Sequence, residues 1–143
     1  TTLAKVIANT TSAEFLQMNA TSAGKKDMEE VVQQAKNNQG MYGKKTILFI
    51  DEIHRFNKGQ QDYLLPFVED GTIILIGATT ENPYFEVNGA LLSRSIIFEL
   101  HALEKEDIKK LLVRAVTDKE KGMGAYQAVI DEDALEFMAD VAN

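Results

Sequence analysis

The apolar residues of the first hundred positions alternate between a helical spacing and short continuous runs. The apolar positions from Met28 to Ala35 repeat at i, i+3, i+4 and i+7, the pattern of an amphipathic helix. Two runs, 46–50 and 73–76, are apolar without alternation, which is typical of strands covered on both faces of a parallel sheet. Strands that alternate with helices predict an α/β sheet built from right-handed crossovers. We expect helices at 1–8, 28–35, 60–68 and 90–92, and strands at 15–18, 46–50, 73–76 and 96–98.

The pattern changes after the first hundred residues, beyond which the apolar positions fit helices only. An apolar stripe that starts at Ile108 predicts a long helix to about Lys121, where glycines interrupt it. A final helix is predicted to begin after Asp131, a suitable N-cap residue, and to continue to the end of the chain. We therefore expect an α/β domain at 1–102 and a helical domain, of which only the beginning is present, at 103–143.

Composition and charge narrow the classes of function. The chain has 143 residues, of which 45% are hydrophobic and 26% are charged, enough apolar material for a folded core. The formal net charge of −7 makes the chain a poor candidate for binding nucleic acid by bulk electrostatics, so any DNA contact needs a local basic patch or another domain. The absence of cysteine excludes disulfides and thiolate zinc sites. No apolar run is long enough to cross a bilayer, so we expect no membrane partner.

Two adjacent carboxylates follow the first of the two buried strands. In open parallel sheets, ligands bind beyond the carboxyl ends of the strands, which is where Asp51 and Glu52 are predicted to lie. Asp51 is suited to hold the hydration shell of Mg²⁺, because this ion keeps its waters and takes few carboxylate contacts. Glu52 can orient a water for attack on a phosphoryl group, a reaction that depends mainly on positioning and charge stabilisation. The alternative is a strand that ends in solvated acids before a turn.

The residues around and beyond these acids form longer motifs. The segment 51–58, DEIHRFNK, resembles the Walker B segment of clamp-loader-like AAA+ ATPases. The segments 77–83, GATTENP, and 91–95, LLSRS, resemble the replication-associated recombination protein A family, relatives of the Werner-helicase-interacting protein. The resemblance covers essentially the whole chain. It implies the P-loop NTPase (AAA+) fold, with a parallel-sheet core at 1–102 and the beginning of a helical lid domain at 103–143.

Two residues after the second buried strand are candidates for sensing the γ-phosphate. Asn82 can hydrogen-bond the γ-phosphate or the attacking water without adding negative charge, and the resemblance makes it the sensor 1 candidate. Thr80 competes with it, because Thr80 is nearer the strand end and branch-migration relatives use a threonine. On its residues alone, Asn82-Pro83 is a turn dipeptide.

Two further residues gain a role only from the resemblance. Arg94, by itself, is a solvated surface charge. The resemblance makes it the arginine finger, which reaches the ATP site of a neighbouring subunit and stabilises charge on the transferring phosphoryl group. It therefore implies a homo-oligomer with the finger acting in trans. Asn19 resembles an asparagine that holds the catalytic glutamate away until DNA binds in clamp-loader relatives, although on its residues alone it is a turn former.

The beginning of the chain resembles the helix that follows a phosphate-binding loop. A Walker A loop reads G-x-x-x-x-G-K-[ST] and runs into a helix. The resemblance places Thr1 at the Mg²⁺-coordinating position and includes Thr2 among the nucleotide-binding residues. The Gly-Lys pairs at 24–25 and 43–44 lack the earlier glycine of that motif. We therefore expect the loop and the family's first strand to precede Thr1, and the family's sensor 2 arginine to follow Asn143.

Taken together, these motifs predict ATP hydrolysis with Mg²⁺, in which Glu52, Asn82 and Arg94 are catalytic. The resemblance implies a DNA-dependent ATPase of replication-fork maintenance, recombination and repair in the bacterial cytoplasm or nucleoid. It implies single-stranded or gapped DNA, single-stranded-DNA-binding protein and replication proteins as partners. A clamp-loader subunit and a Holliday-junction branch-migration motor are alternatives within the class. A third interpretation is a non-enzymatic scaffold or interaction module, and we expect little nucleotide binding by residues 1–143 alone.

Overall fold

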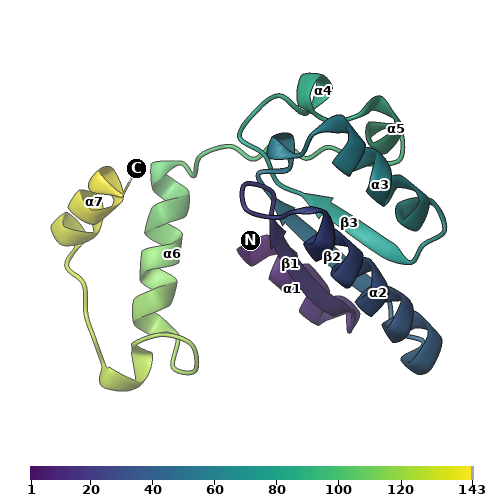
Figure 1. The fold of residues 1–143 in the computed structure, drawn as a ribbon. Coiled ribbons are helices and arrows are strands. Elements are labelled where there is room, and N and C mark those ends of the chain that lie inside the picture. Colours follow the sequence, from purple (N-terminus) through teal and green to yellow (C-terminus); the bar gives the residue numbers. More distant parts are fainter. Residues whose placement is uncertain (143) are drawn as a thin grey trace. The chain divides into compact units, whose positions relative to one another are not determined.

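The structure, a computed structural model, describes residues 1–142, and the chain divides into two compact units, Thr1–Ile97 and Phe98–Asn143 (Figure 1). The assignment of these units to the domains predicted at 1–102 and 103–143 stays a prediction. The first unit contains, in chain order, helix α1 (Thr2–Thr11), strand β1 (Glu14–Asn19), helix α2 (Lys25–Tyr42), strand β2 (Thr46–Asp51), the single turn η1 (Ile53–Arg55), helix α3 (Lys58–Glu69), strand β3 (Ile73–Gly77), and the short helices α4 (Pro83–Glu86) and α5 (Gly89–Leu92).

The three strands form one parallel sheet in the order β1-β2-β3. The central strand β2 is buried from Thr46 to Ile50, as its unalternating apolar run predicts. Its register pairs Asp51 with Asn19 of β1 and Ile50 with Gly77 of β3. All three strands therefore end at the same edge of the sheet, which we call the carboxyl edge.

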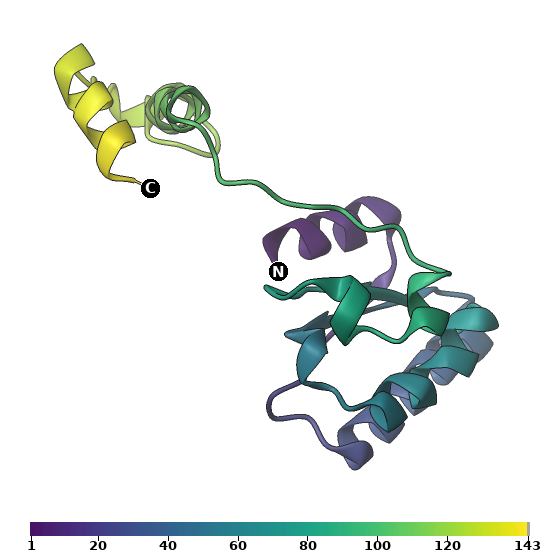
Figure 2. The same ribbon diagram turned by 90° about the horizontal axis from the view of Figure 1, so that it is seen from above.

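Helices cover both faces of the sheet, with α1 on one face and α2 and α3 on the other (Figure 2). The core under α2 and α3 includes Met28, Leu48 and Leu64, which are almost fully buried. Because side chains alternate along a strand, Asn19 and Asp51 point to the opposite face, the one that α1 covers. Only two residues connect α1 to β1, so α1 runs antiparallel to the strands and its N-terminus lies at the carboxyl edge.

The predicted elements of this unit are present apart from one strand. The prediction of a strand at 96–98 is wrong, because these residues form no ladder with any of residues 1–142. An extended segment becomes a strand only through hydrogen bonds to a neighbour, and Ile96 and Phe98 are 80% and 78% exposed. Pro66 does not end α3, which continues to Glu69.

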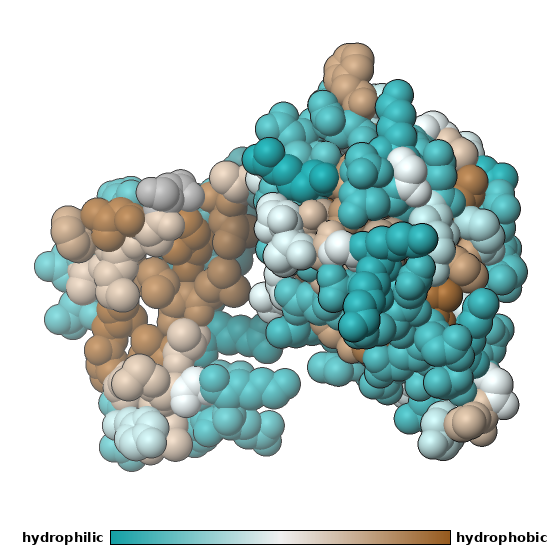
Figure 3. Space-filling model, viewed as in Figure 1, coloured by the Kyte–Doolittle hydropathy of each residue, from teal (hydrophilic) through white to brown (hydrophobic). Residues whose placement is uncertain are grey.

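The second unit pairs helix α6 (Lys105–Thr117) with helix α7 (Glu132–Val141). Lys105 Nζ contacts a carboxylate oxygen of Glu136 at 2.6 Å and one of Asp140 at 2.7 Å, linking the two helices. The single turn η2 (Gly124–Tyr126) lies between them. Many apolar side chains of this unit remain exposed, and brown side chains gather over α6 and α7 in Figure 3. Among residues 1–142, no helix combines the length and the apolar character that a bilayer crossing requires.

Two predicted helix ends in the second unit differ from the structure. Helix α6 ends at Thr117 rather than near Lys121, because the Asp118 carboxylate accepts hydrogen bonds from the backbone N–H groups of the next turn. These hydrogen bonds also lower the pKa of Asp118. Asp131 is the N-cap of α7, as predicted, but the helix ends at Val141, and the last residue of the chain lies outside the described residues.

Candidate functional site

The chain turns sharply where β2 ends, and this turn fixes the backbone of Glu52. Glu52 has φ 55° and ψ 43°, a left-handed conformation that costs a non-glycine residue about 1–3 kcal/mol. On either side of it, Ile53 N–H donates to Ala78 O at 3.0 Å and Ala78 N–H donates to Ile50 O at 2.9 Å. The strained residue is therefore held between two hydrogen bonds to the residue that follows β3.

A glycine at the end of β3 allows this turn to approach the sheet closely. A Cβ atom added to Gly77 would lie 2.9 Å from Cδ1 and 3.2 Å from Cγ2 of Ile53. Ile53 is only 4% exposed, so its side chain has little room to move away. Gly77 and Ile53 together set the distance between the Glu52 turn and β3.

The Glu52 carboxylate has a buried histidine as its partner. His54 Nε2 lies 3.3 Å from Glu52 Oε2, and His54 Nδ1 lies 2.9 Å from Thr79 Oγ1. The His54 side chain is 7% exposed and that of Glu52 is 34% exposed. The sequence alone assigned no role to His54 or to Thr79. The proximity of His54 to Glu52 was a signal in the sequence, but the contact with Thr79 depends on the pairing of β2 with β3.

Asn19 lies beside Asp51 at the carboxyl edge, but its side chain contacts its own turn. Asn19 Oδ1 accepts from Thr21 N–H at 2.9 Å and from the Thr21 hydroxyl at 2.7 Å. The partner of the Glu52 carboxylate in this structure is His54. The role of Asn19 in holding Glu52 away stays a prediction.

The two sensor candidates both lie in the exposed segment after β3. Asn82 Oδ1 accepts from Tyr84 N–H at 3.0 Å, which makes Asn82 the N-cap of α4, with Pro83 at the first helical position. Thr80 is exposed. It lies between Thr79 and Glu81, and the Thr79 hydroxyl oxygen accepts a hydrogen bond from Glu81 N–H. The assignment of Thr80 or Asn82 to γ-phosphate contact stays a prediction.

Arg94 lies far from Glu52 in the fold. Its Nη2 atom contacts Glu69 Oε1 at 2.6 Å, and its Nη1 atom donates to Ala90 O at 2.9 Å. Glu69 is the last residue of α3, a helix of 12 residues that starts at the carboxyl edge and leads about 18 Å away from it at 1.5 Å per residue. The Arg94 side chain, 44% exposed, is therefore at the opposite end of the unit from Glu52.

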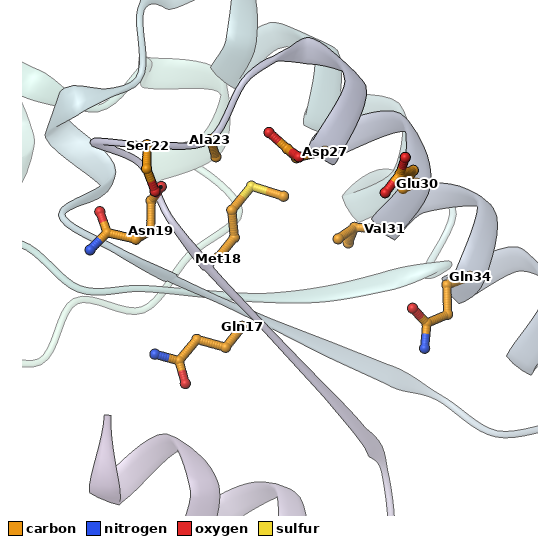
Figure 4. Close-up of a pocket in the computed structure, with 9 residues that line it drawn as sticks. All are labelled: Gln17, Met18, Asn19, Ser22, Ala23, Asp27, Glu30, Val31 and Gln34. Carbon is orange, nitrogen blue, oxygen red and sulfur yellow. Dashed lines mark hydrogen bonds between the residues drawn. The ribbon is translucent and has the colours of Figure 1, made fainter.

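A hollow of about 350 Å³ lies beside the edge strand β1. Figure 4 shows Asn19 and Ser22 at the strand end and two acids, Asp27 and Glu30, on the adjoining turns of α2. Asp27 caps the start of this helix by accepting from Gly24 N–H at 2.7 Å. Two carboxylates without a facing cation repel phosphate groups, so we do not assign nucleotide binding to this hollow.

The carboxyl edge on the α1 face provides oxygen groups that fit Mg²⁺. Asp51 is half-buried there, and Thr1 is the N-cap of α1 with a hydroxyl that makes no capping hydrogen bond. Thr2, the first residue of α1, is exposed beside it. One carboxylate and one hydroxyl suit Mg²⁺, which keeps several waters. No cluster of three or more metal-binding side chains occurs within residues 1–142.

The sequence of the chain matches a known protein family. The family model described as "ATPase family associated with various cellular activities (AAA)" matches residues 1–103. The chain therefore belongs to the AAA ATPase family, and the predicted P-loop NTPase fold is confirmed.

Within that family, the relatives it matches include proteins of one name from several bacteria. The chain is 46% identical over 143 residues to "Replication-associated recombination protein A" of Haemophilus influenzae, covering 100% of this chain and 32% of that protein. It is 50% identical over 139 residues to the Bacillus subtilis protein of the same name, covering 97% and 32%. It is 48% identical to "ATPase WRNIP1" of Dictyostelium discoideum, covering 100% and 16%. The predicted resemblance is confirmed, and the chain spans about a third or less of these relatives.

Solved structures of a Thermotoga maritima protein share the fold. The structure titled "RuvB Holliday junction branch migration motor" has a TM-score of 0.69 and 26% identity, and covers 96% of this chain and 43% of that chain. A mutant of the same protein, T158V, has a TM-score of 0.72 and 27% identity, and covers 96% and 43%. The identity to these motors is much lower than to the replication-associated recombination proteins.

Proposed function

We propose that this chain is the ATP-hydrolysing core of a DNA-dependent ATPase that acts in replication-associated recombination and repair. The observation that carries the proposal is the pair of acids at the carboxyl edge, Asp51 and Glu52, in a chain of the AAA ATPase family. ATP and Mg²⁺ are the ligands that this site takes. Family membership and the identity to the replication-associated recombination proteins support this function over the branch-migration motor.

The geometry of the carboxyl edge supports distinct roles for the two acids. Asp51 and Thr1, with Thr2 beside it, would hold Mg²⁺ and the phosphates on the α1 face of the sheet. Mg²⁺ supplies neutralisation of phosphate charge when it is bound. Glu52 orients a water with the carboxylate oxygen that His54 does not contact, on a backbone held by two hydrogen bonds. Thr80 or Asn82 provides the neutral group beside the γ-phosphate.

The position of Arg94 supports action on a neighbouring subunit. Helix α3 separates it from the Glu52 turn by about 18 Å, which is longer than an arginine side chain. Arg94 would therefore complete the site of an adjacent copy and stabilise the transition state there. Hydrolysis then requires a homo-oligomer.

The DNA partner is proposed from the relatives, since this acidic chain lacks the net positive charge of a non-specific DNA-binding domain. Single-stranded or gapped DNA is the proposed effector, with single-stranded-DNA-binding protein and replication proteins as further partners. Comparing the stimulation of ATP turnover by single-stranded ends, a sliding clamp and four-way junctions separates this function from the clamp-loader and branch-migration alternatives. Stimulation by four-way junctions alone would favour the motor.

The test of the catalytic assignment is Glu52→Gln in the full-length gene product. We expect ATP turnover to fall by about 100-fold or more, the usual loss when a general base is removed, while ATP binding is retained. Glu30→Gln is the matched control, because Glu30 lines the hollow beside β1 and should leave turnover unchanged. Equal ATP turnover in Glu52→Gln and the unaltered protein would contradict the catalytic role of Glu52. Absence of turnover from both proteins would favour the non-enzymatic interpretation.

A further inference from the structure

A continuous path of close polar contacts joins the segment after β3 to the carboxylate after β2. The path starts at Glu81 N–H, which donates to Thr79 Oγ1 at 3.0 Å. Thr79 Oγ1 lies 2.9 Å from His54 Nδ1. The other ring nitrogen, His54 Nε2, lies 3.3 Å from Glu52 Oε2.

The chemistry of the end groups gives this path a direction. An ionised carboxylate can only accept hydrogen bonds, so the 3.3 Å contact with Glu52 Oε2 favours the ring form that carries a hydrogen on His54 Nε2. In the neutral ring, Nδ1 has a free lone pair and accepts the Thr79 hydroxyl hydrogen. The Thr79 oxygen then accepts from Glu81 N–H, and each donor in the path faces one acceptor. A longer 3.5 Å contact of the same hydroxyl with Glu81 O would need the same hydrogen, so the shorter bond is favoured.

The burial of His54 makes this path a fixed connection. Its side chain is 7% exposed, so water does not readily replace either of its partners. Glu52 is partly open to solvent, and its Oε2 atom is the one that His54 contacts. The Glu52 carboxylate therefore contacts His54 through one oxygen while its side chain stays partly open to solvent.

Resting on the proposed role of Glu52, we propose that His54 is a positioning residue that couples the segment 79–82 to Glu52. This segment carries Thr80 and Asn82, the two candidates for γ-phosphate contact. A nucleotide that moves the segment also moves Thr79, and through His54 it changes the orientation of the Glu52 carboxylate. The presence of a γ-phosphate thereby regulates when Glu52 is aligned with the attacking water.

The test removes the hydroxyl of Thr79 while keeping the volume of the side chain. In the full-length gene product, Thr79→Val should lower kcat by about three- to tenfold, the rate equivalent of one hydrogen bond. The Kd for ATP should stay within about twofold, because the change affects alignment rather than binding. Thr79→Ser keeps the hydroxyl and should restore most of the rate. Equal kcat in Thr79→Val and the unaltered protein, or a loss that Thr79→Ser does not restore, overturns the proposal.

A double-mutant comparison separates a path through His54 from a direct effect of Thr79. In a His54→Phe background, Thr79→Val should have no further effect on kcat, because the path is already broken. A full additional loss in that background would overturn the proposal. If His54→Phe does not fold, the Thr79→Val and Thr79→Ser pair still decides the result.

A structural readout is available without enzyme activity. The chain has two histidines, and His101 is exposed in the second unit, where it serves as an internal reference. In ¹⁵N spectra, Thr79→Val should shift the Nδ1 signal of His54 but not that of His101, and Thr79→Ser should leave both near their original positions. An unmoved His54 signal contradicts the path. Turnover that depends on Glu52 but not on Thr79 or His54 would reject this inference alone, whereas turnover independent of Glu52 would reject the proposed function.

Discussion

The contact between Gly77 and Ile53 gives a prediction whose size follows from the structure. Gly77→Ala places a methyl group 2.9 Å from Ile53 Cδ1 and 3.2 Å from Ile53 Cγ2. Both distances are shorter than the 3.5–4.0 Å separation of carbon atoms in contact. Ile53 is 4% exposed and belongs to the core under α2 and α3, so relief of the clash requires a shift of its side chain or of the turn.

The expected loss of stability is the difference between two effects. Overpacking of a closely packed site costs about 1–3 kcal/mol. Replacing glycine by alanine recovers about 0.4–1 kcal/mol, because the unfolded chain loses freedom. The midpoints of these two ranges differ by about 1.3 kcal/mol, so we expect Gly77→Ala to lower the free energy of unfolding by about 1–2 kcal/mol.

Urea unfolding of the 143-residue chain, followed by circular dichroism, measures this difference. The control is Gly40→Ala, an exposed position within α2 where an added Cβ meets no atom within 4 Å. This control should raise stability by about 0.5–1 kcal/mol, the helix preference of alanine over glycine. A loss of stability in Gly77→Ala together with a gain in Gly40→Ala would show that the loss comes from packing around position 77.

A second variant tests the identity of the clashing atom. Ile53→Val removes Cδ1, the atom nearest the added methyl group. In that background Gly77→Ala should cost about 1 kcal/mol less than in the unaltered chain. A clash with Ile53 is refuted if Gly77→Ala is as stable as the unaltered chain, or if its loss of stability is the same with Val at position 53.

Three other changes test the core, a helix cap and the second unit. Leu48→Ala, at a fully buried position of β2, should lower the free energy of urea unfolding by about 2–5 kcal/mol. Asn57→Ala removes the side chain that accepts from Gln60 N–H at the start of α3 and should cost about 0.5–2 kcal/mol in the same assay. Hydrogen bonds from Lys105, then from Lys109, lower the pKa of Glu136. The ion pairs of Glu136 therefore stabilise the fold above the ordinary pKa of 4.5, and this stability is lost as the pH falls through the lower pKa of the folded state. When the free energy of unfolding is measured against pH, it should fall less on acidification in Glu136→Gln than in the unaltered chain.

Much of the first unit could be predicted from its sequence, because burial leaves a direct pattern. The unalternating run at 46–50 predicts a strand covered on both faces, and the structure buries β2 on both faces. The helical spacing from Met28 to Ala35 likewise corresponds to the buried face of α2. The segment 96–98 has the same apolar character but pairs with no strand among residues 1–142. Apolar composition alone therefore predicts neither the burial nor the pairing of 96–98, because both depend on a neighbour elsewhere in the chain.

The acids of the candidate site could be predicted, but their contacts could not. Asp51 and Glu52 are adjacent in the sequence, and their place at the end of a strand follows from the apolar run before them. The contact of His54 with Thr79 joins residues 25 positions apart and requires the left-handed backbone of Glu52. No local pattern specifies that conformation, because glycine rather than glutamate is the usual residue there.

The most direct test of the account measures where the metal–nucleotide binds. The full-length gene product is prepared with labelled alanine and isoleucine methyl groups. It is mixed with a non-hydrolysable ATP analogue and Mn²⁺ in place of Mg²⁺, and the paramagnetic broadening of each methyl NMR signal is measured. Ala20 and Ala78 follow the ends of β1 and β3, whereas Ala13 directly precedes β1 and Ile73 is the first residue of β3, about 16–23 Å away at 3.3 Å per residue. Binding of the metal–nucleotide at the carboxyl edge predicts strong broadening at Ala20 and Ala78 and little at Ala13 and Ile73. Equal broadening at both ends, or stronger broadening at the starts, would contradict it.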